Sequence, residues 1–491
     1  MTQPHVAFTS LQGRALFSLL FLASPGLMAA ENHAAKDNND AEETITVVAN
    51  DARQSATSGY QPLSSSTATL TSMPLLDIPQ VVNTVSDRVL EDQHATSLDE
   101  ALYNVANVVQ TNTLGGTQDA FTRRGFGANR DGSIMTNGLR TVLPRSFNAA
   151  TERVEVLKGP ASTLYGILDP GGLINVITKR PERQFSGSVS GTSTSFGGGT
   201  GSVDVTGPIE GTNLAYRLIG EYQNEDYWRN FGKNKSRFIA PSLTWFGDRA
   251  TVTASYSHRD YSAPFDRGTI FDLNTGHAVN VDRKTRFDEA FNITDGYSDL
   301  AQLNAEYRLN DAWTARFDYS YSQDHYNDNQ ARVVAYDSAT GNLTRRVDGT
   351  HGSTQKMHST RADLQGNVVV GGFYNELLTG VAYENYDLLR TDMLRCKNVK
   401  GFNIYHPVYG TLDTCNTVSA SDSDQRIQQE SYAAYVQDAL YLTDNWIAVA
   451  GVRYQYYTQY AGKGRPFNVN TDSRDEKWTP KAGLVYKVTP N

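Results

Sequence analysis

The sequence has few of the residues on which several protein classes depend. Only 2 of its 491 residues are cysteine, too few for a disulfide-dense scaffold or a four-thiolate metal site. Basic residues number 44 against 53 acidic ones, so no excess of positive charge points to nucleic acid. The mean hydropathy is -0.47, and the single apolar stretch, residues 15–30, excludes a bundle of helical spans of about 20 residues each.

Aromatic residues and glycine are instead abundant, with Tyr 27, Phe 19 and Gly 40. A composition that is rich in these residues yet polar on average is typical of proteins built from many strands joined by turns. We therefore expect a mainly β protein, and 491 residues leave room for a small domain beside one large β unit.

The first 30 residues have the three parts of a secretory signal peptide. Arg14 precedes a short apolar run, and the small residues Ala29 and Ala30 end the segment. The run is too short for a retained anchor helix. We expect residues 1–30 to be removed on export, and residues 31–60 to begin as a solvated tail of Ala, Asn, Asp and Glu.

Residues 61–181 combine short apolar runs with glycine turns, which predicts a small α+β domain. Val154 and Val156 alternate with charged neighbours, as in a strand. Ser97 and Glu100 have the spacing of a capping box, which predicts a helix over 97–106.

Residues 182–491 instead consist of long alternating segments. In residues 313–321 every odd-numbered residue is aromatic or Ala, and every even-numbered one is Thr, Arg, Asp or Ser. Short connections alternate with long ones, which we place at 224–235, 261–297, 324–353, 388–426 and 460–475. Tight turns at one rim and long loops at the other are typical of an antiparallel transmembrane β-barrel. A secreted β-sandwich or propeller is the alternative.

About a dozen strands are predicted in this region. A barrel of about 12 strands is too narrow to hold a plug domain, whereas a barrel of about 22 strands can hold one. They lie near 184–195, 200–207, 212–223, 236–246, 249–260, 298–309, 312–323, 356–370, 373–387, 427–442, 445–459 and 476–489. The chain ends at Asn491 without a terminal aromatic strand, so we expect a barrel truncated at its C-terminus.

Motifs in the first region resemble the plug motifs of TonB-dependent outer-membrane receptors, in the same order. They lie at residues 76–80, 124–126, 137–139, 152–160, 164–166 and 170–181. The Pro-Gly-Gly that opens the last motif, with Asn and Lys-Arg-Pro after it, is most similar to siderophore receptors of the ferrichrome type. The tail resembles the family's TonB box at Glu43, Thr44, Ile45, Thr46, Val47 and Val48.

The resemblance implies a fold and a function. The fold is a plug, residues 61–181, inside a barrel of about 22 strands. Residues 182–491 would form only a part of that barrel, with about ten of its strands missing. The function is active uptake of ferric siderophores across the outer membrane of a Gram-negative bacterium. The partners are membrane lipid, the siderophore and periplasmic TonB, with no nucleic acid, and the receptor is expected to be a monomer. An extended β-branched box can add a strand to a partner's sheet.

No cofactor is expected, because the iron arrives already chelated by the siderophore. The receptor then needs aromatic and hydrogen-bonding groups rather than metal ligands. The candidate ligand-binding residues are Arg124, Arg130, Arg145, Phe147 and Tyr165. For Arg124 an ion pair between plug and barrel is the alternative. Arg145 and Phe147 have a solvated loop as the alternative, and Tyr165 has packing inside the plug.

A second set of residues in the plug motifs is assigned structural roles. We interpret Glu152, Arg153, Glu155 and Lys158 as ion pairs between the plug and the barrel wall. The other structural positions of the plug motifs are Gly159, Pro170, Gly171, Gly172 and Asn175.

The two cysteines, Cys396 and Cys415, fall in one long predicted loop. In an exported protein we expect them to form a disulfide that braces the loop, and two free thiols are the alternative.

Other functions stay open. A non-transporting barrel fragment, a passive pore, a phage-binding surface protein and a receptor for another metal chelate are the alternatives. No nucleophile, carboxylate pair or phosphate loop has a coherent spacing, and the 9 histidines form no metal-spaced pair, so an enzyme is not expected.

Overall fold

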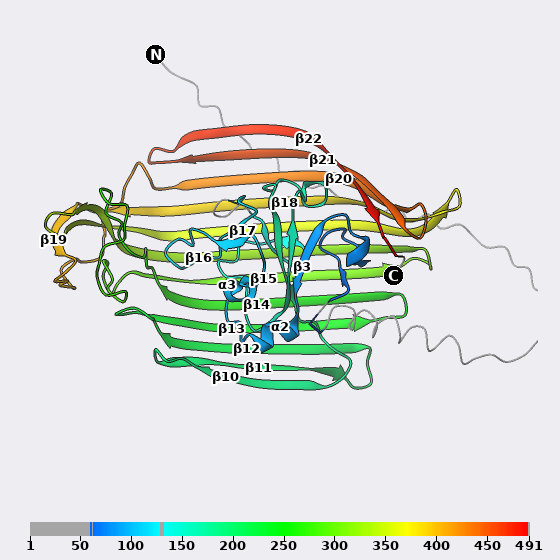
Figure 1. Cartoon of the computed structure of the whole chain (residues 1–491), viewed down its shortest axis with the longest axis horizontal. Coiled ribbons are helices and arrows are strands. Elements are labelled where there is room, and N and C mark those ends of the chain that lie inside the picture. The colour runs from blue at the N-terminus through cyan, green and yellow to red at the C-terminus, as the bar shows by residue number, and fades with distance from the viewer. Residues whose placement is uncertain (1–58, 61, 128–131, 490–491) are drawn as a thin grey trace, which may run out of the picture. The chain divides into compact units, whose positions relative to one another are not determined.

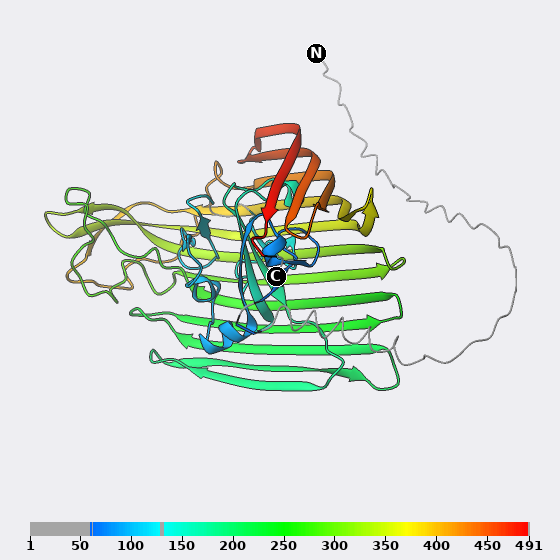
Figure 2. The same cartoon turned by 45° about the vertical axis from the view of Figure 1, so that its right-hand side comes forward.

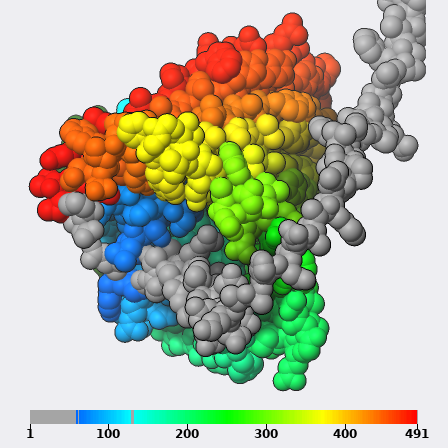
Figure 3. Space-filling view, turned by 90° about the vertical axis from the view of Figure 1, so that its right-hand side faces the viewer, coloured from blue at the N-terminus to red at the C-terminus, as the bar shows by residue number. Residues whose placement is uncertain are grey.

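The computed structural model describes residues 59–60, 62–127 and 132–489, all within one compact unit. The predicted signal peptide, the TonB box and Arg130 lie outside the described residues. Two sheets dominate the fold, a small one in the first region and a large one in the second. Figure 1 shows the small domain, in blue to cyan, against one face of the large sheet, and in Figure 3 the sheet curves around it.

The small domain, which we call the plug, has a five-stranded sheet in the order β3-β8-β9-β6-β7. These strands are β3 Val81–Val85, β8 Thr151–Lys158, β9 Gly172–Thr178, β6 Ile134–Thr136 and β7 Leu139–Arg140. The other elements are β1 Ser64–Ser65, β2 Met73–Pro74, β4 Val108–Gln110, β5 Phe121–Arg123, the 3-10 turn η1 Leu75–Asp77, α2 Asp87–Asp92, α3 Leu98–Leu102 and α4 Ser162–Tyr165. The strand predicted around Val154 and Val156 is confirmed as β8, whose valines are fully buried.

The predicted helix is confirmed as α3, but it ends four residues earlier, at Leu102. The Ser97 hydroxyl accepts a hydrogen bond from the Glu100 amide at 3.3 Å, as in a capping box. The Glu100 carboxylate, however, accepts from the amide of Thr96 at 2.7 Å. Among the described residues, no helix is long and apolar enough to cross a bilayer.

The large sheet, which we call the wall, is antiparallel and contains thirteen strands. Twelve follow one another in chain order, which confirms the predicted number and order, and β19 Val399–Asn403 pairs with β17 beside that path. The twelve are β10 Ser186–Ser193, β11 Gly198–Ile209, β12 Leu214–Asp226, β13 Lys233–Phe246, β14 Ala250–Pro264, β15 Ile293–Arg308, β16 Trp313–Asp337, β17 Asn342–Val370, β18 Phe373–Arg395, β20 Gln425–Tyr441, β21 Trp446–Lys463 and β22 Asn468–Tyr486.

Three of the five predicted long loops are wrong. β16 and β17 continue to a tight turn, so 324–353 is mostly a hairpin, and 460–475 is likewise mostly strand. In 224–235 the strands continue at both ends and leave a short connection at 227–232. Figure 2 shows these strands, in yellow-green, extending past the others at one end of the sheet. Beyond a lipid-facing band no apolar face is required, so the alternation that reveals a strand disappears. Only residues 265–292 and 396–424 remain long connections.

The face of the wall away from the plug carries the apolar alternation. Large apolar side chains such as Leu303, 37% exposed, and Val381, 56% exposed, lie on it. Aromatic residues border this band, as in β16, where Trp313 and Tyr321 lie eight residues apart, about 26 Å along a strand. The apolar band of outer-membrane barrels is about 25 Å tall with aromatic girdles at both edges. The outer face of the wall therefore has the pattern of a lipid-facing surface.

A charge in the middle of this band is expected to destabilise the wall. Leu303→Arg places a guanidinium between the aromatic borders of β15 and costs about 2–4 kcal/mol, whereas Asp295→Arg, at the outer end of the same strand, costs about 0–1 kcal/mol. Heat-modifiable mobility of the protein in outer-membrane fractions measures the folded share. Equal loss for the two variants would contradict a lipid-facing band.

Candidate functional site

The wall holds the plug through side chains that donate to plug backbone carbonyls. Arg361 bonds to the carbonyl of Gly138 at 3.3 Å, and Arg453 to that of Leu164 at 3.1 Å. Both arginines lie on the lumenal face of the wall, which we define as the face that contacts the plug. Hydrogen bonds from charged donors are stronger than neutral ones, so these contacts fix the plug position firmly.

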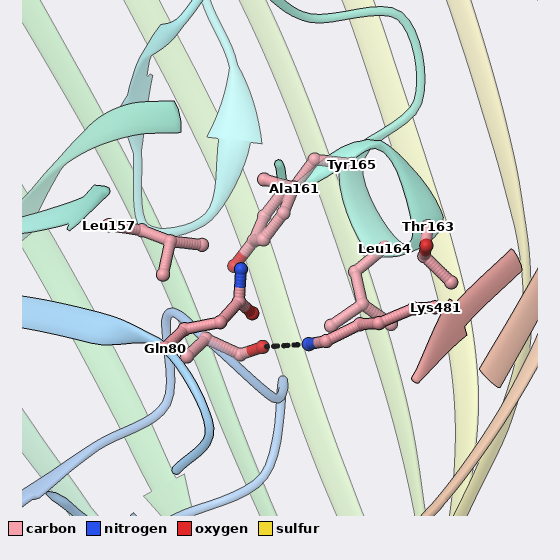
Figure 4. Close-up of a pocket in the computed structure, with 8 residues that line it drawn as sticks. Gln80, Leu157, Ala161, Thr163, Leu164, Tyr165 and Lys481 are labelled. Atoms are coloured by element: carbon pink, nitrogen blue, oxygen red, sulfur yellow. Dashed lines mark hydrogen bonds between the residues drawn. The ribbon is translucent and has the colours of Figure 1, made fainter. Parts of the chain in front are cut away.

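One plug segment, residues 64–71, is held in this way along its length, and we call it the strap. Four consecutive carbonyls accept side-chain donors: that of Thr67 from Tyr165 at 2.8 Å, of Ala68 from Lys481 at 3.5 Å, of Thr69 from Gln437 at 3.4 Å and of Leu70 from Arg316 at 2.9 Å. The dashed line in Figure 4 marks the bond made by Lys481. Three of the four donors come from wall strands, so the strap lies in the seam between plug and wall.

Glu155 fixes the strap to the plug core. This carboxylate is fully buried and accepts hydrogen bonds from the hydroxyls of Ser65 and Thr67. Arg153 donates to it at 2.8 Å, which balances the buried charge. The Asn175 amide adds a bond to the Thr67 hydroxyl at 2.9 Å. The segment that enters the plug is thus held by the plug on one side and by the wall on the other.

The predicted ion pairs between plug and wall are wrong for these residues. Arg153 pairs with Glu152 and Glu155, both of them plug residues. Lys158 has no ion-pair partner among the described residues, and burial, with the nearby Arg124, lowers its pKa. Arg153 is next to Glu152 and two positions from Glu155 on the same strand, so these charges are paired within the plug rather than with the wall.

The glycines of the plug motifs lie where chain segments approach closely. Gly172 has φ +103°, and a Cβ there would lie 1.9 Å from the carbonyl oxygen of Leu157. A Cβ at Gly171 would lie 2.3 Å from the carbonyl oxygen of Arg123. Gly159 bonds through its amide to the Gly171 carbonyl at 3.1 Å, and Pro170 is exposed in the turn before them. These residues shape the plug backbone.

The candidate ligand-binding residues lie in different surroundings. Arg124 is exposed with φ +50° and has no ion pair among the described residues. Arg145 forms an ion pair with Asp119 at 3.0 Å, and Phe147 is partly buried against a plug core. Tyr165 is 5% exposed, so its burial favours the packing alternative over ligand contact. The structure therefore does not bring these residues together into one pocket.

An outer loop, residues 265–292, contacts the plug beside Arg145. The amide of Asp266 donates to the carbonyl of Gly115 at 2.8 Å, and a Cβ on Gly115 would lie 2.6 Å from the Phe265 ring. Arg145 bonds to the carbonyl of the next residue, Gly116. This contact, which we call the latch, joins the loop directly to the plug.

The outer loops have a packed core of their own. Arg345 of β17 pairs with Glu289 at 2.8 Å, with both side chains 2% exposed, and its guanidinium lies 4.0 Å from the Phe402 ring centroid. A disulfide joins Cys396 and Cys415 in the second loop. Ion pairs, an aromatic ring and a disulfide thus stabilise the loops above the latch.

A narrow crevice, with a cavity volume of about 40 Å³, separates the plug from β12–β15. Its wall side has small side chains, including Ala240, Ser242 and Ser255. In the part of the chain that the structure describes, no group of three or more His, Cys, Asp or Glu side chains is placed to hold a metal ion.

Comparisons with known proteins match both regions of the chain. Residues 74–173 match the TonB-dependent receptor plug domain, and residues 237–491 match the TonB-dependent receptor-like β-barrel. The chain belongs to the TonB-dependent receptor family. Membership implies the outer membrane of a Gram-negative bacterium, in agreement with the apolar band on the wall.

Two curated relatives of this receptor are the metal-pseudopaline receptor CntO of Pseudomonas aeruginosa, 29% identical, and the catecholate siderophore receptor Fiu of Escherichia coli K12, 27% identical. The matches cover 91% of this chain and 64% of CntO, and 94% of this chain and 66% of Fiu. The receptor chain therefore spans less than two thirds of the length of these relatives. The crystal structure of BauA, the ferric preacinetobactin receptor of Acinetobacter baumannii, has a TM-score of 0.78 at 22% identity, covering 88% of this chain and 65% of BauA, and shows a shared fold.

Sequence reasoning about the receptor missed the donors at the seam. Arg316 lies in the segment 313–321, whose alternation assigns it to the polar face, and Lys481 and Gln437 lie in other alternating segments. The alternation predicts on which face of the wall a side chain lies, but not which group it binds, because the acceptors are backbone carbonyls with no sequence signature.

The contact between the latch loop and the plug can be tested by substituting Gly115 and Gly116. Gly115→Ala and Gly116→Ala share the cost of a side chain at positive φ, but only the first meets the Phe265 ring. We expect Gly115→Ala to cost at least about 1 kcal/mol more and to speed hydrogen exchange in residues 265–292. Equal exchange in both variants would show that the loop does not rest on the plug.

Loop stability is also expected to depend on pH. Burial raises the pKa of Asp288 from 3.8 to about 6, against the attraction of Arg286 at 2.6 Å. The carboxyl group of Asp288 is therefore protonated more readily in the closed loop than in the open loop. The resulting stabilisation of the closed loop is complete below pH 3.8 and is lost as pH rises through about 6. Hydrogen exchange of residues 286–292, corrected for intrinsic rates, is expected to give a larger opening free energy at about pH 5 than at about pH 7.5. Asp288→Asn removes this difference, and an unchanged difference in that variant would contradict the assignment.

Proposed function

We propose that this receptor takes up ferric siderophores across the outer membrane in a TonB-dependent reaction. The observation that carries the proposal is a plug held by polar bonds inside a wall whose outer face has a lipid-facing pattern. A plugged lumen prevents free diffusion, so passage requires displacement of the plug. The plug is assigned to residues 61–181 and the barrel to 182–491.

In this proposal the box at residues 43–48 follows a signal peptide, residues 1–30, and pairs with periplasmic TonB as an added strand. The box lies 16 residues before Ser64, where the strap begins. A pull on the tail therefore reaches the strap before any other seam contact of the described chain. The bonds of the strap are single side-chain contacts, which separate one after another rather than together.

The ligand is proposed to enter above the latch, between the outer loops and the plug. Arg145 lies beside the latch and Arg124 is exposed, and both are proposed as ligand contacts. Iron arrives chelated, so the receptor needs no resident cofactor.

A second candidate substrate class is a chelate of another metal. The observation that favours it is the relative named as a metal-pseudopaline receptor. Competition between iron, nickel, zinc and cobalt chelates for uptake distinguishes the two candidates.

Deletion of residues 43–48 tests the energised reaction. We expect the deletion to abolish uptake of radiolabelled ferric chelate by iron-starved cells and to leave chelate binding to outer membranes unchanged, because the box supplies force rather than affinity. A scrambled box of the same composition is the control for tail length. Undiminished uptake after the deletion would favour a passive pore.

A further inference from the structure

Above the latch, the lumenal face carries guanidinium groups that lack carboxylate partners. Arg267, in the first outer loop, donates to the amide oxygen of Gln330 at 2.6 Å. Arg390 of β18 donates to the amide oxygen of Gln425 at 3.0 Å. Among the described residues neither arginine has a carboxylate within ion-pair distance, so amides are the acceptors of both cations.

A third arginine, Arg332 of β16, competes for a carboxylate that is already occupied. Asp348 accepts two bonds from Arg346, at 2.7 and 2.9 Å, and Arg332 reaches it only at 3.4 Å. The Nε atoms of Arg332 and Arg390 are buried and have no hydrogen-bond partner among the described residues. A buried donor without an acceptor costs free energy, so neither guanidinium is fully stabilised by its present hydrogen bonds.

These groups lie on the face that contacts the plug. Even-numbered residues of β16 point to the lumen, as Arg316 shows by its bond to the strap, and Arg332 continues that series. Even-numbered residues of β18 do the same, because Glu384 pairs with Arg140 of the plug at 3.1 Å. Arg390 continues this second series towards the outer loops.

Arg267 connects these cations with the plug. Its guanidinium lies 5.2 Å from the centroid of the Phe265 ring, the ring that rests on Gly115 in the latch. A ligand that binds Arg267 therefore contacts the residue that directly follows Asp266 of the latch.

We propose that Arg267, Arg332 and Arg390 form an arginine collar that selects metal chelates with net negative charge. The proposal rests on the proposed uptake function and names its substrate class. Guanidinium groups bind carboxylates through two parallel bonds and form charge-assisted bonds to single anionic oxygens, which suits the peripheral oxygens of an anionic chelate. Asp348 is shared by the guanidiniums of Arg332, Arg346 and Arg395, so this one carboxylate does not neutralise the cations around it, and their positive potential attracts anions.

Equilibrium binding to outer membranes that contain the full chain tests the collar. The probes are a strongly anionic iron(III) tris-catecholate and a cationic iron(III) trihydroxamate that carries a protonated amine. We expect the anionic probe to bind more tightly, with an affinity that falls as salt rises. Arg267→Gln and Arg390→Gln are each expected to weaken binding of the anionic probe about tenfold and to leave the cationic probe within about twofold.

Arg426→Gln is the matched control, because Arg426 pairs with Asp387 on the face away from the plug and is expected to change neither affinity. Arg390→Lys keeps the charge but not the two parallel bonds, and we expect an intermediate loss. Heat-modifiable mobility checks that each variant is folded. Equal losses for both probes, or tighter binding of the cationic probe, would overturn the collar while leaving uptake intact. Failure of the unaltered protein to bind any chelate would overturn the proposed function, and the collar with it.

Discussion

Side-chain donors on the lumenal face of the wall, bonded to backbone carbonyls of the plug, determine how the two domains are joined. A plug carbonyl buried against the wall needs a donor, and a lumenal guanidinium needs an acceptor. Arg361 and Arg453 each donate to one plug carbonyl, and Arg361 also pairs with Asp318 and Asp363 of the wall. The seam also contains an apolar cluster, in which Leu70 and Leu164 of the plug pack with Leu378, Ile447 and Val449 of the wall, so its separation exposes both polar and apolar surface.

The strap and the latch are two separate contacts of the plug, the strap with the wall and the latch with an outer loop. The strap is held by Glu155 from within and by wall strands from without, and it is the part of the described plug nearest to the tail in sequence. The latch joins Gly115 to the loop that carries Arg267. In the proposed reaction, ligand binding above and force below act on the same domain, in which β8, the strand that carries Glu155, pairs with β3 and β9. In this view the plug is both the barrier and the connection between the two events.

Much of the fold was predictable because the lipid-facing surface imposes a strict period of two. That period identified all twelve consecutive wall strands, and it failed where the constraint ends. In β16 the alternation stops after Tyr321, and the strand continues through polar residues that only its partner β17 stabilises. The register shift between Tyr326 and Asp328 lies in this extension. The sequence does not encode such pairing in a local pattern.

The functional residues were harder to predict than the fold. The plug motifs identified Glu155, Gly172 and Asn175 as structural, but the partners of Glu155 proved to be Ser65, Thr67 and Arg153 rather than the wall. Residues in contact across about 90 positions of sequence have no shared local signal. The seam and the latch depend on backbone carbonyls, which every residue possesses, so only coordinates reveal which ones are used.

Hydrogen exchange of the strap in outer membranes tests the central claim most directly. The amides of Thr67 to Thr71 lie in residues that are almost fully buried between plug and wall. If the seam holds the strap, these amides exchange as slowly as those of β8 in the plug core. Exchange at the rate of an unstructured peptide, with β8 still protected, would show that the strap is not held in the seam.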